Sequence, residues 1–489
     1  IPPTTPFSYT NQAGLTGTYT VGPTGNYLTL TAAAASFNTS CLLTNVVFEL
    51  QGGYTGAYSS SNETYPIIFN NNIYTDGSSG SYTLTIRPTT GANPTILGAS
   101  GQALIKLNGA DRIIIDGSNN GTSSRNLTIT NTDPNNTGSN LWLNAGSSSD
   151  GANFNVIKNC KINANYVLGE PTILAGVFSS ANAANSNNTL QNNEIYGVYS
   201  AIHIEGKQPT GFDQNWLIED NVLGNNVSNP IALEAIYLKG CENFEIRDNT
   251  ITGLKNITGS FDFLSGILLD SYTSNGSVHN NKISDIQHTS YWGSNGICLS
   301  SNNPGSNITV YNNFIMNVRS LGYSNYGIND NGYGIFVNAG GGYNIYYNSI
   351  SMGSQSSGYP AAINISSAIT ASSTLDIRNN IFSNQGTGGT RFGMVLQASN
   401  SVLKFNDNND YYAVSYIGRA SSTNVNTLPG WRALTGMDNS SVAVNPMFTN
   451  AASDLHLLIS STLNALATPI TGITLDIDNA TRDAVKPDI

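Results

Sequence analysis

Charged side chains are scarce in this sequence of 489 residues, because Asp, Glu, Lys and Arg together make up only 10% of it. A typical soluble domain has about 25%. The 19 Lys and Arg against 30 Asp and Glu give a net charge of −11, and no run of basic residues occurs. Since nucleic-acid phosphates require basic patches, these features argue against nucleic acid as a partner. No apolar run approaches the roughly 20 residues that span a bilayer, so we expect no membrane span.

Cysteine and histidine are also rare, with four residues of each. Cys41, Cys160, Cys241 and Cys298 show no Cys-x-x-Cys spacing, and no His-x-His or His-x-x-x-His occurs, which argues against zinc and redox motifs. We therefore expect free thiols and no resident cofactor. No Asp-x-Asp-x-Asp-Gly loop is present, so calcium remains an option only through scattered carboxylates. The first residue, Ile1, is not Met, and we expect that a signal peptide or preceding region has been removed.

Asparagine, in contrast, is abundant and recurs as a pair followed by a hydrophobic position. The clearest examples are residues 280–283 (Asn-Asn-Lys-Ile) and 312–315 (Asn-Asn-Phe-Ile), and relaxed copies follow at spacings between 28 and 35 residues. Such a period is the signature of a repeat architecture. We predict that the second position of each copy forms a structural ladder: Asn193, Asn221, Asn249, Asn281, Asn313, Asn348, Asn380 and Asn408, with Cys160 in the equivalent place before them.

A second pattern runs in phase with the first and consists of a small residue, an aliphatic, any residue and another aliphatic. It occurs at 201–204, 235–238, 266–269, 296–299, 334–337, 362–365 and 393–396. Each period therefore holds two short alternating segments, and alternation is the period of a β-strand. Strands too short to form a sheet within one repeat must stack on the next repeat, which predicts a parallel β-solenoid. No Leu-x-x-Leu-x-Leu frame or Trp-Asp signature supports leucine-rich or propeller repeats.

The asparagine column has a physical reason, because Asn tolerates the left-handed backbone of a sharp corner between strands. With this column the chain resembles the right-handed parallel β-helix of the pectate-lyase superfamily, in which asparagine ladders sit at a turn inside the coil. The resemblance covers nearly the whole chain, but its motifs are architectural. It implies an all-β fold, a right-handed parallel β-helix in one domain.

Three segments are expected within this domain: an N-terminal lead-in and cap (1–80), coils (81–412) and irregular C-terminal coils (413–489). Residues 1–27 indicate an irregular lead-in. A helix is predicted over 28–37, with Thr29 or Thr31 as its cap; this helix before a strand resembles the opening of pectinesterase-like proteins, where it covers the open end of the solenoid. The last segment resembles the final coils of large secreted bacterial surface proteins, which are often exported by type IX secretion. We expect an extracellular or cell-surface location, and long polar loops at 317–332 and 353–360.

Phasing of the repeat aligns the outward positions of the first strand into columns. His203, Glu205, Tyr237, Lys239 and Asp270 fall in three consecutive coils and form the best candidate active site. Resemblance to polysaccharide lyases implies Lys239 as base, Tyr237 or His203 as acid, and Glu205 and Asp270 as calcium ligands. A glycoside hydrolase would instead use Glu205 and Asp270 as acid and base, roughly 10 Å apart. The simpler explanation is a surface charge ladder without catalysis, which we favour.

The second strand carries an outward aromatic stripe made of His279, Tyr311 and Tyr346. Such rings would stack on sugars, because an aromatic ring offers a flat apolar platform with polar edges. Cross-strand stacking of the rings on one another is the alternative, and the one we favour.

The predicted function is a non-enzymatic, secreted or surface-displayed module with a structural or adhesive role that contacts glycans. The low charge, the regular coils and the missing signatures of lyases and polygalacturonases favour it. A carbohydrate-active enzyme, either a polysaccharide lyase or a glycoside hydrolase around Lys239, is the first alternative. A subunit of an extracellular fibre is the second, since solenoid faces suit lateral assembly. The partners expected are therefore glycans, other surface proteins or further copies of the chain.

Overall fold

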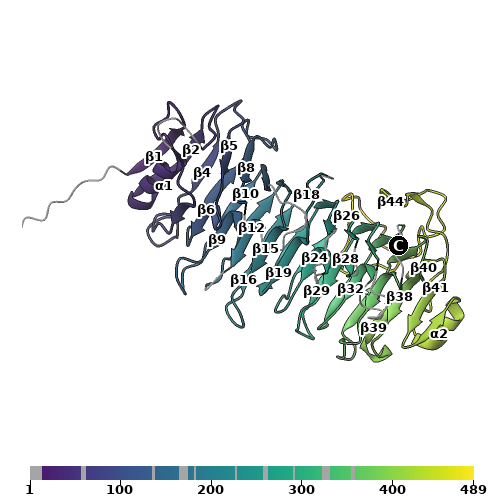
Figure 1. Cartoon of the computed structure of the whole chain (residues 1–489). Helices are drawn as coiled ribbons and strands as arrows, with labels where there is room; N and C mark the ends of the chain where they lie inside the picture. Colours follow the sequence, from purple (N-terminus) through teal and green to yellow (C-terminus); the bar gives the residue numbers. More distant parts are fainter. Residues whose placement is uncertain are drawn as a thin grey trace, which may run out of the picture.

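The computed structural model describes residues 14–56, 62–134, 138–164, 175–180, 183–225, 228–256, 263–289, 292–321, 331–353 and 358–489. Within them the chain winds into a right-handed parallel β-helix whose coils are stacked in one long row (Figure 1). The predicted fold class is confirmed. Each regular coil runs through one strand of each of three sheets, which we call sheet 1, sheet 2 and sheet 3 in the order the chain enters them.

Sheets 1 and 2 meet at the asparagine corner. Sheet 1 contains β1 (Leu15–Val21), β2 (Leu42–Leu50), β4 (Leu84–Pro88), β7 (Ile113–Asp116), β10 (Val156–Lys158), β13 (Thr189–Gln191), β17 (Leu217–Glu219), β21 (Glu245–Arg247), β25 (Ser277–His279), β29 (Ile308–Tyr311), β33 (Tyr343–Tyr346), β36 (Leu375–Arg378) and β39 (Leu403–Asp407). Sheet 2 contains β5 (Thr95–Gly98), β8 (Leu127–Asn131), β11 (Cys160–Ala164), β14 (Glu194–Tyr196), β18 (Val222–Gly224), β22 (Thr250–Thr252), β26 (Lys282–Ser284), β30 (Phe314–Met316), β34 (Ser349–Ser351), β37 (Ile381–Asn384) and β40 (Asp410–Ala413).

Sheet 3 carries the longest strands of the regular coils. It contains β3 (Ile67–Asn70), β6 (Ala103–Asn108), β9 (Ser139–Asn144), β12 (Ala175–Ser180), β15 (Ser200–Glu205), β19 (Glu234–Lys239), β24 (Leu264–Leu269), β28 (Ser294–Leu299), β32 (Gly332–Val337), β35 (Ala361–Ile365), β38 (Phe392–Leu396), β41 (Tyr416–Ala420) and the antiparallel β42 (Thr423–Val425). Small sheets add β16 (Asp213–Gln214) with β20 (Cys241–Glu242), β23 (Lys255–Asn256) with β27 (Gln287–His288) and β31 (Arg319–Ser320), and β43 (Phe448–Asn450) with β44 (Asp454–Leu457).

The small residue at the start of each sheet 3 motif is explained by packing inside the coil. A Cβ added at Gly296 would lie 2.5 Å from Ile315 Cγ2, and one added at Gly334 would lie 2.4 Å from Ile350 Cγ2. The two aliphatics that follow, such as Ile297 and Leu299, are fully buried. The core is therefore built from one small and two branched side chains per sheet 3 strand, as the sequence pattern predicted.

The asparagine pair divides two tasks between its members. The first residue of the pair adopts the left-handed backbone, as Asn280 does with φ 56°, and turns the chain from sheet 1 into sheet 2. The second forms the buried ladder: Asn281 Oδ1 accepts from the amide N–H of Asn249 at 3.1 Å, and Asn281 Nδ2 donates to Asn313 Oδ1 at 3.0 Å. The same ladder runs through Asn193, Asn221, Asn249, Asn281, Asn313, Asn348 and Asn380, and the Cys160 amide donates to its first member.

The last predicted member of the ladder was wrong by one residue. Asn408 has φ 55° and occupies the corner, whereas Asn409 Oδ1 accepts from the amide N–H of Asn380 at 2.9 Å. The run Asp407-Asn408-Asn409 offers two pairs, and Asn408-Asn409 is the one in phase, because Tyr411, two residues after Asn409, is buried and pairs with Phe382. With the earlier pair, Asp407-Asn408, the hydrophobic position would fall on Asp410, so the prediction took the wrong one of the two pairs.

Helices cover the two ends of the solenoid core. The predicted N-terminal helix is α1 (Leu30–Thr39), with Thr29 as its cap, and it buries Leu30 and Phe37 against the first coils. The carboxylate of Glu63 accepts the amide N–H groups of Leu30 and Thr31 at 2.6 and 2.8 Å, which satisfies free donors of the first turn. Strand β1 lies where an irregular lead-in was expected. At the other end, α2 (Leu428–Thr435) places Trp431 in the core.

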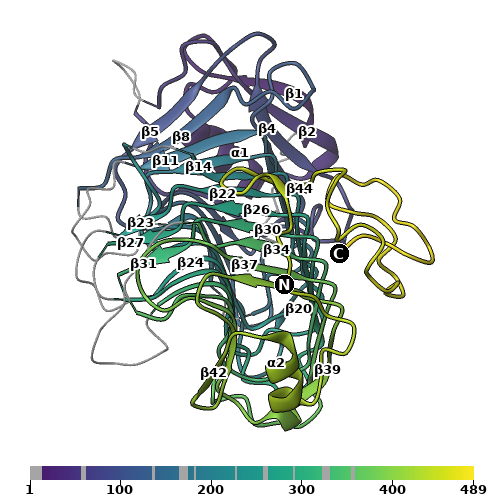
Figure 2. The ribbon, with the colours of Figure 1, turned by 90° about the vertical axis from the view of Figure 1, so that its right-hand side faces the viewer.

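Of the expected C-terminal coils, β41 and the bridge from Val442 to Asp410 continue the solenoid, whereas the segment after Val442 does not form further coils. It folds back and lies outside the row of corner residues, where Figure 2 shows it in yellow beside the coils. Asn408 Nδ2 donates to the carbonyl of Leu466, and Asn312 Nδ2 to that of Leu475. The corner side chains thus also bind a segment that comes much later in the sequence.

Other predictions from the sequence have simple outcomes. The four cysteines are free, and only Cys41 is exposed. In the ranges given above, no helix has the length and apolar character needed to cross a bilayer. Residues 322–330 and 354–357 of the two predicted long loops lie outside the described residues.

Candidate functional site on the outer side of sheet 3

Strand pairing in sheet 3 brings the five predicted active-site residues together. His203 pairs with Tyr237, and Glu205 pairs with Lys239, on the neighbouring strands β15 and β19. Asp270 follows at the end of β24, where the Tyr237 hydroxyl donates to Asp270 Oδ2 at 2.8 Å. The inward neighbours of these side chains, such as Ile202 and Ile204 on β15, are buried in the core. We call the five residues the His203 cluster.

Stacked rings continue the His203 cluster toward the N-terminal coils. The rings of Trp142, Phe178, His203 and Tyr237 follow one another on β9, β12, β15 and β19, with centroid distances of 5.9, 5.5 and 4.3 Å. The Lys106 ammonium lies 4.1 Å from the Trp142 centroid and closes this stripe on the N-terminal side. His203 and Tyr237 stack nearly parallel, so their faces cover each other, and only a small part of each ring reaches the surface: Tyr237 is 8% exposed and the His203 side chain 14%. Ring edges carry partial positive charge and attract oxygen atoms.

A row of uncharged amides runs beside the ring stripe. Asn144 Nδ2 donates to Asn108 Oδ1 at 2.9 Å, and Asn108 Nδ2 donates to Asn70 Oδ1 at 3.0 Å. Register places Glu205, Lys239 and then Asp270 in the continuation of the same row. The outer side of sheet 3 thus has an aromatic column next to a polar one.

The charges of the cluster are not arranged as the surface ladder that we favoured from the sequence. Among the described residues, no carboxylate oxygen lies within 4.0 Å of the Lys239 ammonium nitrogen. Glu205 instead accepts from His203, with His203 Nε2 and Glu205 Oε1 3.5 Å apart, and Asp270 is bonded by Tyr237. Lys239 is left as a cation without an ion-pair partner between two carboxylates that have their own partners.

Electrostatics fixes the protonation of two members of the cluster. The hydrogen bond from His203 lowers the pKa of Glu205 below its ordinary value, and the charges of His203 and Lys239 add to this effect. Burial raises the pKa of the Tyr237 phenol far above its ordinary value, and the neighbouring Asp270 carboxylate raises it further. Glu205 is therefore an acceptor at neutral pH, while Tyr237 stays protonated and acts only as a donor.

After β24 several outward side chains of sheet 3 are apolar and buried. The outward side chains of Cys298 and Phe336 are buried, and they join Tyr333, Phe392 and Val395 in a separate apolar cluster outside the coil. The polar and aromatic surface suited to a ligand therefore ends near Asp270.

Three members of this surface were missed from the sequence: Lys106, Trp142 and Phe178. Their strands carry weaker copies of the motif, with the buried Asn140 in the small position of β9. The register Lys106, Trp142, Phe178, His203 would have followed from extending the column by three more coils.

The predicted aromatic stripe on sheet 1 is present, and two of its rings stack on each other. The rings of His279 and Tyr311 are 4.5 Å apart with an angle of 10°, and His279 Nε2 lies 3.0 Å from Glu245 Oε1. Tyr346 lies under the Arg378 guanidinium at 5.3 Å. For His279 and Tyr311 the structure thus shows the cross-strand stacking we favoured.

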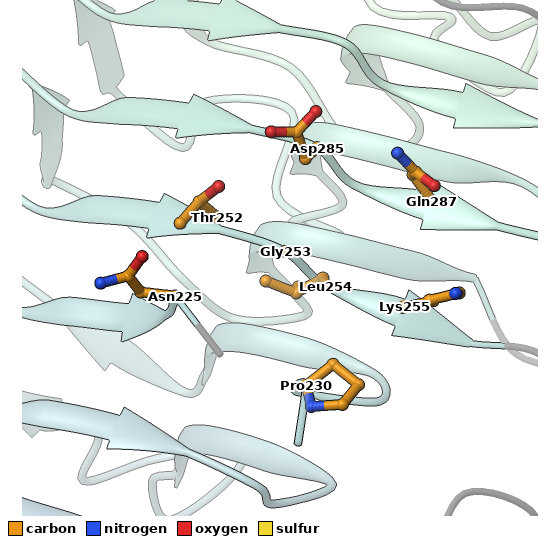
Figure 3. Close-up of a pocket in the computed structure, with 8 residues that line it drawn as sticks. All are labelled: Asn225, Pro230, Thr252, Gly253, Leu254, Lys255, Asp285 and Gln287. Atoms are coloured by element: carbon orange, nitrogen blue, oxygen red, sulfur yellow. The ribbon is translucent and has the colours of Figure 1, made fainter. Parts of the chain in front are cut away.

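A further hollow lies at the corner between sheets 2 and 3 (Figure 3). It has a volume of about 280 Å³, and Thr252, Lys255, Asp285 and Gln287 contribute to its lining. Leu254 and Pro230 supply its apolar lining, and none of the described residues that line it is aromatic. In the part of the chain that the structure describes, no three His, Cys, Asp or Glu side chains gather closely enough to hold a metal ion.

No protein-family model matches this sequence, and no curated protein matches it either. Three similar solved structures are a GH136 lacto-N-biosidase from Eubacterium ramulus (9% identity, TM-score 0.41, 83% of this chain and 68% of that one), a mannuronan C-5 epimerase A-module from Azotobacter vinelandii (12%, 0.38, 76% and 92%) and the pectate lyase Pel9A (10%, 0.33, 93% and 100%). At these identities and TM-scores the likenesses indicate no activity for this chain.

Proposed function

We propose that the chain is a glycan-binding β-solenoid that holds a neutral polysaccharide along the outer side of sheet 3. The observation that carries the proposal is the unpaired Lys239 between Glu205 and Asp270, beside the ring stripe. Along the polar row, Glu205 accepts, Lys239 donates and Asp270 accepts hydrogen bonds, and neighbouring members are one coil spacing of about 4.8 Å apart. Sugar hydroxyl groups both donate and accept, so one glycan chain satisfies all three.

The ring stripe supports an extended ligand. From Trp142 to Tyr237 it spans three coil spacings, or roughly 14 Å along the axis. The edges of these rings carry a weak positive charge, which favours contact with the oxygen atoms of a sugar ring. A polymer that repeats along its axis meets such a row at several points, whereas a single sugar meets one.

Binding of neutral polysaccharides, measured by affinity electrophoresis and titration calorimetry, tests this proposal. Lys239→Met and Glu205→Gln each remove one charged hydrogen-bonding group, and each should weaken binding about tenfold, or about 1.4 kcal/mol. Lys161→Met on the outer side of sheet 2 is the matched control and should bind like the unchanged protein. Equal affinity in all of these variants would reject the sheet 3 site.

A carbohydrate-active enzyme is the second candidate, and the same unpaired amine is the observation that favours it. In a lyase acting on acidic polysaccharide, Lys239 would take the proton next to the uronate carboxylate, and the protonated Tyr237 would supply one to the leaving oxygen. A depolymerisation screen that detects new unsaturated and new reducing ends, with and without calcium, separates the two candidates. Cleavage that is lost in Lys239→Met with the fold intact would establish the enzyme, and binding without new ends would favour the adhesive module.

A further inference from the structure

The returning C-terminal segment forms one wall of a cleft on the outer side of sheet 1. The cleft has a volume of about 590 Å³, within the range of about 300–1,000 Å³ typical of ligand sites. Residues 469–473 line it on one side, and the strands β25, β29, β33, β36 and β39 supply the floor. It lies on a different sheet from the His203 cluster.

The wall of this cleft is fixed on both sides. Before it, the carbonyl of Thr468 accepts from the Tyr347 hydroxyl and from Asn379 Nδ2, both at 2.8 Å, and the Thr468 amide donates to Asn379 Oδ1 at 3.1 Å. After it, Asn312 Nδ2 donates to the carbonyl of Leu475 at 2.8 Å. The Arg482 guanidinium also lies 4.0 Å from the Tyr347 ring centroid. The cleft is therefore preformed, and a ligand need not order its wall.

The floor offers hydroxyl groups next to aromatic rings. Ser277, Thr309 and Asn344 face outward from successive strands, beside the Tyr311 and Tyr346 rings. The hydroxyls of Ser277, Thr309 and Tyr311 make no hydrogen bond within the described part of the chain. They are free to bond the hydroxyls of a sugar in the cleft.

One end of the cleft carries an excess of positive charge. Arg378 forms a double hydrogen bond with Asp376, at 2.6 Å from Nε and 2.8 Å from the terminal nitrogen, so this pair is neutral as a whole. Lys404 has no carboxylate oxygen within 4.0 Å among the described residues, and the cleft thus holds one uncompensated cation. In a chain with a net charge of −11, this cation favours an anionic ligand locally.

We propose that this cleft is a second ligand site that binds a short acidic saccharide. Its carboxylate would pair with Lys404, and its hydroxyls would bond the hydroxyls of Ser277, Thr309 and Tyr311. The wall of residues 469–473 encloses a short saccharide on one side, in contrast to the open side of sheet 3. The proposal is independent of the neutral polysaccharide proposed there.

Titration calorimetry of the whole chain with a galacturonic acid trisaccharide, and with the neutral galactose trisaccharide, tests this site. Lys404→Met removes the cation, and Thr471→Trp fills the cleft from its exposed wall. Both variants should weaken binding of the acidic trisaccharide at least tenfold. Lys161→Met, and Lys239→Met in the His203 cluster, should leave it unchanged.

Failure of the acidic trisaccharide to bind, or binding that Thr471→Trp does not weaken, would overturn the site. Equal affinity for the neutral trisaccharide would overturn the acidic preference. Binding lost in Lys239→Met but retained in Lys404→Met would place the ligand on sheet 3 and would also reject the cleft. Unchanged thermal unfolding of Thr471→Trp verifies that its effect is local.

Discussion

Replacing one member of the asparagine ladder, Asn281→Ala, should destabilise the coil without straining the backbone. Its Nδ2 donates to the carbonyls of Ile246 and His279 at 3.0 and 2.9 Å, and to Asn313 Oδ1 at 3.0 Å. Its Oδ1 accepts the Asn249 amide N–H at 3.1 Å and Asn249 Nδ2 at 3.0 Å. The left-handed position belongs to Asn280, so alanine fits at 281 and only hydrogen bonds are lost.

The magnitude follows from the groups that lose a partner. Asn249 and Asn281 are almost completely buried, so water does not replace the amide. A buried donor left without an acceptor costs about 1–3 kcal/mol, and at least one backbone N–H and one side-chain amide are affected. The total loss should be about 3–5 kcal/mol, a large part of the 5–15 kcal/mol that separates most folded domains from their unfolded states.

Solenoids open locally, so the assay must resolve single coils. Hydrogen exchange at the Asn249 amide should accelerate more than 100-fold, which corresponds to about 2.8 kcal/mol. Thr250→Ala is the control, because Thr250 is the exposed first residue of β22 and directly follows Asn249. It should change the exchange of the Asn249 amide only slightly. An Asn281→Ala protein that exchanges no faster than this control would refute the idea that the ladder stabilises the coils.

Three further changes test the charges and the close packing. Burial raises the pKa of the Asp410 carboxyl to about 7, so the folded state holds a proton that the unfolded chain, with its pKa of about 3.9, releases; the free energy of unfolding should fall as the pH rises from about 4 to about 7, and Asp410→Asn should flatten this slope in urea titrations. Arg247→Met leaves the buried Glu219 without its ion-pair partner and should cost about 1–2 kcal/mol at pH 7 but less near pH 4, where an equal loss would contradict the ion-pair explanation. Gly224→Ala, at φ 92°, would place its Cβ 1.8 Å from the Thr252 carbonyl oxygen, so an unchanged unfolding temperature would contradict this packing.

The coils and their outward columns were accessible from the sequence because they depend on local, repeated contacts. The same small–aliphatic pattern returns in every period, so each strand fixes the face of its own side chains. Register then followed from alignment, and the pairs His203 with Tyr237 and Glu205 with Lys239 are as predicted. The ladder was predictable for the same reason, except at Asn408, where three consecutive residues offer two pairs and the position of Tyr411 shows that Asn409 is the ladder member.

The partners of each side chain and the path of the C-terminal segment were decided only by the tertiary structure. Alignment places Glu205, Lys239 and Asp270 in one row, but which charges pair depends on side-chain directions, and Tyr237 and His203 take the two carboxylates. The last segment has no period, and its hydrogen bonds to the corner residues join positions as far apart as 197 residues. A repeat pattern contains no information on such contacts, because they are made once. For that reason the cleft on sheet 1 could be found only in the tertiary structure, whereas the repeat in the sequence was sufficient to predict the solenoid.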